Sequence, residues 1–147
     1  MEKLPTKQNA QLLEYAQYES NYEAIKALVK AGAELDCVNE QGATALHIAT
    51  QHNNHNMVAL LLELKANLNA KDQQGNTALH YAVMIKNKMA AKALIEVGAN
   101  PNIKNNDNKT ALKIAQETHN AEMVKILLPT SGHKSVFYNK KRVPLNW

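Results

Sequence analysis

The stretch GATALHIA, residues 42–49, is followed 33 residues later by GNTALHYA, residues 75–82, and after the same interval by NKTALKIA, residues 108–115. A fixed interval of this length is typical of a repeat protein, in which one supersecondary unit is stacked several times. The alignment also extends backwards to a fourth, degenerate unit at the start of the chain. One slot holds asparagine in all four units, at Asn21, Asn54, Asn87 and Asn120.

Each unit has the residue pattern of two short helices joined by turns. The first apolar pattern follows a threonine, a good N-cap residue, at Thr44, Thr77 and Thr110. A second helix is predicted over residues 57–64, where Val58, Leu61 and Leu62 share one face. The asparagine between the two patterns either adopts a left-handed turn or caps the second helix. Because one unit is too short to bury its apolar face, neighbouring units must stack.

The string D-x-x-G-x-T-x-L-H-x-A and the ending G-A-x-x-N closely resemble the ankyrin repeat over about residues 6–128. The resemblance implies an all-α fold, a solenoid of stacked helix-turn-helix units joined by short hairpins or loops. The chain departs from the family pattern in a few places. Alanine follows the threonine where proline is usual, and Lys65 replaces a glycine. In the last unit, Asn108 and Lys113 replace glycine and histidine.

We predict one ankyrin repeat domain over residues 1–128 and a C-terminal extension over residues 129–147. The units fall at about residues 6–38, 39–71, 72–104 and 105–128. The first and last units are expected to be caps, because the ends of a repeat array must keep a polar outer face. The last unit carries suitable polar residues: Lys113, Gln116, Glu117, Glu122 and Lys125.

The composition is that of one soluble globular domain, with 147 residues and a net charge of +4. The longest apolar run, residues 57–62, is far below the roughly 18 residues that span a membrane. The N-terminus has no apolar stretch of the kind that a secretory signal needs. The single cysteine, Cys37, cannot form an internal disulfide. We therefore predict a protein of a reducing compartment, the cytoplasm.

The histidines form no catalytic or metal-binding pattern. His47 and His80 lie three residues after the cap threonine, so we expect a structural hydrogen-bonding role for both. His52 and His55 do not complete a zinc pattern, and solvated turn histidines are the preferred interpretation. No nucleophile is placed beside a base, and no glycine-rich phosphate loop is present. We therefore expect no enzyme, no cofactor, no metal and no small-molecule substrate. Cys37 is expected to be an ordinary half-exposed thiol, with a modifiable thiol as the alternative.

The resemblance implies protein–protein recognition through a concave surface of hairpin tips and first helices. The positions where units differ on this surface are the predicted partner-binding residues. They are Glu40, Gln41, Gln51, His52, Gln73, Gln74, Asn76, Met84, Ile85, Asn106, Asp107, Lys109 and Glu117. Met84 and Ile85 are large and apolar where the adjoining units have polar residues. They are the predicted binding hot spot, and the alternative is that they pack against the neighbouring helix or under the C-terminal extension.

The tail carries the whole excess of positive charge, because residues 1–128 hold 13 basic and 13 acidic side chains. Its basic residues include Lys140, Lys141 and Arg142, and its aromatic residues are Phe137, Tyr138 and Trp147. Three interpretations stay open. The tail docks on the last unit, binds an acidic partner or an anionic lipid surface, or is an unordered terminus.

The predicted function is non-enzymatic binding of a partner protein by a monomer. The alternative is an electrostatic adaptor whose basic tail tethers the repeat domain to an anionic membrane or nucleic acid; the few charges disfavour nucleic acid. Asparagine is abundant, at 18 residues, and lysine is strongly preferred to arginine, as in AT-rich genomes. This bias suggests a further hypothesis, a bacterial effector that acts on host proteins and is exported by a route other than Sec.

Overall fold

The computed structural model describes residues 6–128, and its regular secondary structure in that range is entirely α-helical. The helices form four consecutive pairs. They are α1 (Lys7–Tyr15), α2 (Tyr22–Lys30), α3 (Ala45–Gln51), α4 (His55–Glu63), α5 (Ala78–Met84), α6 (Lys88–Glu96), α7 (Ala111–Glu117) and α8 (Ala121–Leu127). The predicted all-α solenoid is confirmed for this part of the chain.

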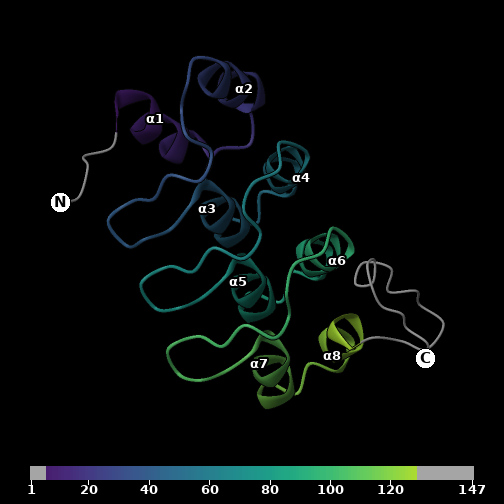
Figure 1. The fold of residues 1–147 in the computed structure, drawn as a ribbon. Helices are drawn as coiled ribbons and strands as arrows, with labels where there is room; N and C mark the ends of the chain where they lie inside the picture. The colour runs from purple at the N-terminus through teal and green to yellow at the C-terminus, as the bar shows by residue number, and fades with distance from the viewer. Residues whose placement is uncertain (1–5, 129–147) are drawn as a thin grey trace.

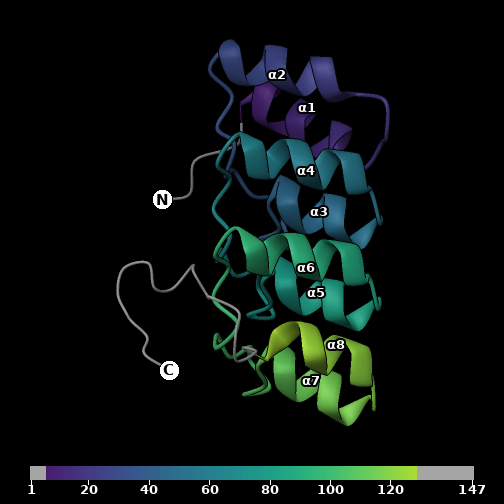
Figure 2. The same ribbon diagram turned by 90° about the vertical axis from the view of Figure 1, so that its right-hand side faces the viewer.

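The helices stand in two rows. Figure 1 shows α1, α3, α5 and α7 in one row and α2, α4, α6 and α8 in the other. The loops that join one pair to the next extend beyond the first row, away from the second. Figure 2 shows the pairs stacked one above another, with these loops gathered at one end of the helices. The loops and the first helices therefore lie on the same side of the molecule.

Local hydrogen bonds begin the helices. The hydroxyl of Thr44 accepts the N–H of His47, and the same bond forms at Thr77 and Thr110, as predicted. Of the two roles left open for the repeated asparagine, the structure shows the cap. The side chains of Asn54, Asn87 and Asn120 each accept a backbone N–H of the following helix, whereas Asn21 makes no such bond.

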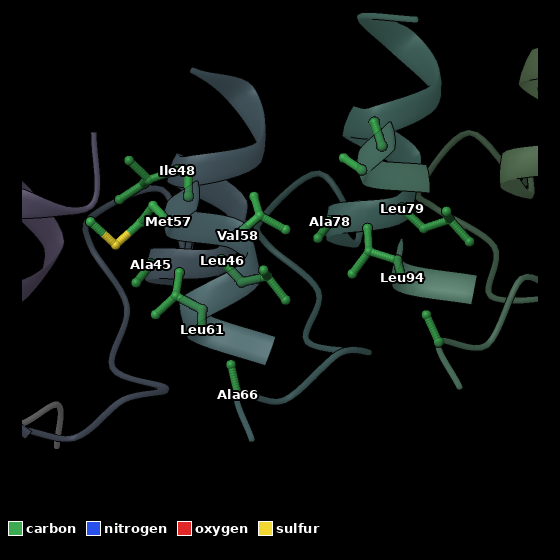
Figure 3. Close-up of a cluster of buried hydrophobic side chains, with 14 of the residues drawn as sticks. Ala45, Leu46, Ile48, Met57, Val58, Leu61, Ala66, Ala78, Leu79 and Leu94 are labelled. Carbon is green, nitrogen blue, oxygen red and sulfur yellow. The ribbon is translucent and has the colours of Figure 1, made fainter. Parts of the chain in front are cut away.

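A continuous apolar core runs between the two rows. Figure 3 shows part of it, with Leu46 and Leu61 grouped in one unit and Leu79 and Leu94 grouped in the next. Burying one leucine contributes about 2 kcal/mol. Each unit is too short to bury its apolar face alone, so packing against its neighbours is needed for stability. Of the three residues expected to share the buried face of α4, Val58 and Leu61 are buried and Leu62 is half-buried.

The last helix pair keeps a polar surface, as the end of an array requires. The side chains expected to provide it are all exposed: Lys113, Gln116, Glu117, Glu122 and Lys125. Only Met123 and Leu127 of α8 are buried. An ion pair between Lys88 of α6 and Glu122 of α8, at 2.6 Å, joins the last two units at their surface.

Candidate functional site

One side chain at the start of each loop sets the shape of that loop. Oδ1 of Asp72 accepts the backbone N–H groups of Gln74 at 3.0 Å and of Asn76 at 2.9 Å. Asn39 and Asn105 make the same two bonds in the second and fourth units. The loop therefore requires an oxygen acceptor in this slot but not a negative charge.

The loop tips are joined to one another by hydrogen bonds. The carbonyl oxygen of Gln41 accepts the N–H of Gln73, and that of Gln74 accepts the N–H of Asn106, both at 3.0 Å. The side-chain amides of Gln73 and Asn106 donate to the carbonyl oxygens of Glu40 and Gln73, both at 2.7 Å. These bonds fix the tips of three units into one preformed edge.

The tip glycines also depend on the next unit. Gly75 has a φ of 79°, and a Cβ built on it would lie 2.5 Å from Oδ1 and 2.7 Å from the backbone N of Asn106. Asn108 occupies the same slot in the last unit with a φ of 62° and is exposed. The departure from glycine at Asn108 is possible because no following tip lies against it among residues 6–128.

The two repeated histidines have the structural role expected of them. Nδ1 of His47 accepts the N–H of Thr44 at 3.0 Å, and Nε2 lies 2.8 Å from the carbonyl oxygen of Asn76. His80 makes the same bonds to Thr77 and, at 2.9 Å, to the carbonyl oxygen of Lys109. Burial lowers the pKa of both histidines, because a charged imidazole would lose its hydration. Both side chains hold units together and face away from solvent.

Most of the predicted partner-binding residues lie on the exposed side of the loops and first helices. Those that are exposed are Glu40, Gln41, Gln51, His52, Gln73, Gln74, Met84, Ile85, Asn106, Asp107 and Glu117. Lys109 is half-buried and forms an ion pair with Glu117 at 2.7 Å. The hydrogen bond and the charge of Lys109 lower the pKa of the Glu117 carboxyl, so this pair is ionised at neutral pH.

Asn76 does not belong to this surface, and its assignment as a partner-binding residue is corrected by its burial. Only 5% of its surface is exposed. Its Oδ1 accepts a hydrogen bond from Nδ2 of Asn105, and its carbonyl oxygen faces Nε2 of His47. Asn76 therefore lies between units, where it joins the third unit to both of its neighbours. Its side chain is occupied in holding the array together.

Met84 and Ile85 end the first helix of the third unit, and each is 40% exposed. Neither side chain is buried against the neighbouring helix. The other alternative, that they lie under the C-terminal extension, falls outside the described residues and stays a prediction. Met89, at the start of α6, is 67% exposed and was missed by the sequence analysis. It lies just after the short turn that begins at Ile85. We call the adjacent pair Met84 and Ile85 the apolar cluster.

A small polar pocket lies between the second and third units, with a volume of about 240 Å³. It is lined by loop residues and by residues of α3 and α5, namely Asn39, Gln41, Ala43, Gln51, Asp72, Gln73, Gln74 and Tyr81. We call it the inter-unit pocket. Its lining shows that the loop tips and the first helices form one continuous surface.

Tyr81 of the inter-unit pocket was not identified from the sequence. Its hydroxyl donates a hydrogen bond to Oδ2 of Asp72. Its ring packs edge-on against the ring of His47, with 5.8 Å between the two ring centroids. Burial and the bond to Asp72 raise the pKa of the Tyr81 hydroxyl. The sequence did contain a signal for Tyr81. The units on either side have isoleucine at the equivalent position, Ile48 and Ile114, so the tyrosine departs from the repeat pattern.

The other candidate groups do not form a chemical site in residues 6–128. His52 and His55 are exposed, as expected. His52 lies in the turn after α3, whereas His55 is the first residue of α4 rather than a turn residue. Cys37 is half-buried, and its burial raises the pKa of the thiol to about 11, which disfavours the reactive thiolate. No group of three or more metal-ligating side chains comes together in the described range. None of the described helices has the length and apolar character needed to cross a membrane.

The predicted tail residues lie outside the described part of the chain. This applies to the aromatic residues Phe137, Tyr138 and Trp147 and to the basic residues Lys140, Lys141 and Arg142. The three interpretations of the tail and the adaptor alternative therefore stay predictions.

The geometry defines a class of protein: a stacked helical repeat array with a preformed surface of loop tips and first helices. The sequence matches the family model for ankyrin repeats, in three copies, over residues 12–105. This match covers more than half of the chain, so the protein belongs to the ankyrin repeat family. Ankyrin repeats are generally protein–protein interaction modules and are typically not enzymes. No curated protein matches this sequence.

Proposed function

We propose that the chain binds a partner protein through its loop tips and first helices, with the apolar cluster as the main anchor. The observation that carries this proposal is the exposure of Met84 and Ile85, each at 40%. The matching slots hold Gln51 and His52 in the second unit. An apolar centre with a polar rim is the usual anatomy of a protein-binding site. Methionine also adapts its shape to a partner at low cost.

The rigidity of the surface supports the same proposal. Hydrogen bonds join the tips of the second, third and fourth units through Gln41, Gln73, Gln74 and Asn106. A preformed surface loses little conformational entropy on binding, which favours affinity. We therefore expect the partner to dock on the array without a rearrangement of the repeats.

The proposal involves no catalysis. The two buried histidines are occupied between units, and Thr44 and Thr77, their nearest hydroxyl groups, cap helices. The binding activity requires only the monomer, which size-exclusion chromatography with light scattering would check. The same surface could bind a partner in the cytoplasm of the cell that produces the protein, or a partner in a host cell. Parallel captures from a bacterial lysate and an animal-cell lysate would distinguish these two settings.

The experiment that tests the proposal replaces the anchor with residues that the fold already accepts. The double variant Met84→Gln, Ile85→His copies the pair Gln51 and His52 of the second unit. Each protein is immobilised, captured partners are identified by mass spectrometry, and the affinity for the purified partner is then measured. We expect the variant to bind at least about tenfold more weakly, as is usual for hot-spot residues.

A matched control is Val97→Gln. Val97 is 51% exposed but lies at the other end of α6 from Met89. This control should keep the affinity of the wild type, and circular dichroism should show that all three proteins are folded. Equal partner affinity in the wild type and the double variant would contradict the proposed anchor.

A further inference from the structure

This inference rests on the proposed function and specifies the chemistry of the partner. We propose that the inter-unit pocket receives an arginine side chain of the partner protein. The pocket measures about 240 Å³, below the roughly 300–1,000 Å³ that is typical of small-molecule sites. Its size therefore suits one protein side chain better than a cofactor or a metabolite.

The charge of the inter-unit pocket selects a cation. Asp72 is the one charged residue in its lining, and the rest are neutral. No basic side chain within residues 6–128 forms a salt bridge with Asp72. The loop does not need this charge, since Asn39 and Asn105 hold their loops with the same two hydrogen bonds. The negative charge of Asp72 therefore has no cationic partner among the described residues, although hydrogen bonds reach both of its oxygens.

The hydrogen-bonding groups favour arginine over lysine. The hydroxyl of Tyr81 donates to Oδ2 of Asp72 and holds the carboxylate in one orientation at the pocket. Gln41, Gln51 and Gln73 also line the pocket, and the oxygen of each side-chain amide is a hydrogen-bond acceptor. A guanidinium group has five N–H donors in a fixed plane and can reach several acceptors at once. The ammonium group of lysine has three donors on one atom.

The position of the pocket links it to the apolar cluster. Tyr81 and Met84 lie three residues apart on α5, so their side chains point to the same side of the helix. An arginine in the pocket would place the neighbouring part of the partner over Met84. The preferred partner segment therefore carries an arginine with an apolar residue close to it.

The test uses the full chain and a probe that does not depend on knowing the partner. Isotope-labelled protein is titrated with N-acetyl-arginine methylamide, and amide shifts are followed by NMR. The matched uncharged probe is N-acetyl-citrulline methylamide, which has nearly the same shape. We expect saturable shifts at the backbone amides of Gln41, Gln73 and Gln74 with the arginine probe only.

Two variants of matched shape isolate the charge. Asp72→Asn keeps the acceptor that the loop uses and should weaken arginine binding by about tenfold, the difference expected when a charge-assisted bond becomes neutral. Asn39→Asp adds a second carboxylate to the same pocket and should strengthen binding, and Asp72 shows that a loop of this kind tolerates the change. Neither change should alter the circular dichroism spectrum.

Three results would overturn the inference. These are an absence of shifts with the arginine probe, equal shifts with both probes, and unchanged arginine binding in Asp72→Asn. None of them bears on the apolar cluster, whose test is the loss of partner affinity in Met84→Gln, Ile85→His. Failure of the arginine site and failure of the proposed function are therefore separate outcomes.

Discussion

His47 donates a hydrogen bond from Nε2 to the carbonyl oxygen of Asn76, 2.8 Å away and 29 residues further along the chain. The donor is assigned because Nδ1 of the same ring accepts the N–H of Thr44 and cannot also carry a proton there. One neutral imidazole thus caps its own helix and joins the second unit to the third. His80 repeats the arrangement between the third and fourth units.

This relationship predicts a pH-dependent stability. In the folded protein, burial holds the pKa of His47 and His80 below the ordinary value of 6.5. The unfolded chain therefore binds more protons once the pH falls below that value, and the folded state loses stability. Full stability is expected above about pH 6.5, with a progressive loss as the pH falls toward the folded-state pKa values.

Urea unfolding followed by circular dichroism at about pH 7.5 and about pH 5 would measure this effect. The control is the double variant His47→Gln, His80→Gln. It lacks the two titrating groups, so its urea midpoint should change less between the two pH values. An unchanged urea midpoint in the wild type over this range would show that the histidines do not couple folding to protonation.

Gly75 and Asn108 occupy one slot in different units and should respond in different ways to substitution. Gly75→Ala adds a Cβ against Asn106 at a φ of 79° and should lower the free energy of unfolding by about 2 kcal/mol or more. Asn108→Gly should change it by less than about 0.5 kcal/mol, since both residues accept a left-handed conformation. Urea midpoints of the two variants provide the comparison, and similar losses would contradict the role assigned to the next tip.

Asn87 should contribute more to stability than its counterpart Asn21. Its Oδ1 caps α6 by accepting the N–H of Ala90, and its Nδ2 donates to Oδ1 of Asn53 in the previous unit at 2.6 Å. Asn87→Ala is expected to lower the free energy of unfolding by about 2 kcal/mol. Asn21→Ala, at a position without a side-chain cap, should lower it by less than about 0.5 kcal/mol. Thermal unfolding would rank the two variants, and a larger loss for Asn21→Ala would refute the assignment.

Cys37 should react slowly with thiol reagents in the folded protein. Its thiol donates a weak hydrogen bond to the carbonyl oxygen of Asn9, and burial raises its pKa from 9.0 to about 11. Near neutral pH the thiolate fraction should then be about a hundredfold lower than in an unfolded chain. Labelling with iodoacetamide, with and without denaturant, would compare the two rates. Equal rates would point to an accessible, modifiable thiol.

The parts of the fold that the sequence predicted correctly depend on contacts close along the chain. The cap threonines bond to residues three positions later, and the apolar residues of a helix share a face through its own period. Recurrence at a fixed interval then reveals that the same unit is stacked. The exposure of Met84 and Ile85 was also predictable, because their slot holds polar residues in the adjoining units.

Within residues 6–128, the sequence by itself determined the paired helices, their order, and the structural role of His47 and His80. Only the tertiary structure decided that Asn76 is buried between units, that Met89 is exposed, and that Tyr81 meets Asp72 in a pocket. The physical reason is the length scale of the interactions. Side-chain bonds within a turn repeat with the local sequence. Contacts between units depend on how two surfaces about one repeat apart fit together, and one repeat alone does not encode that fit.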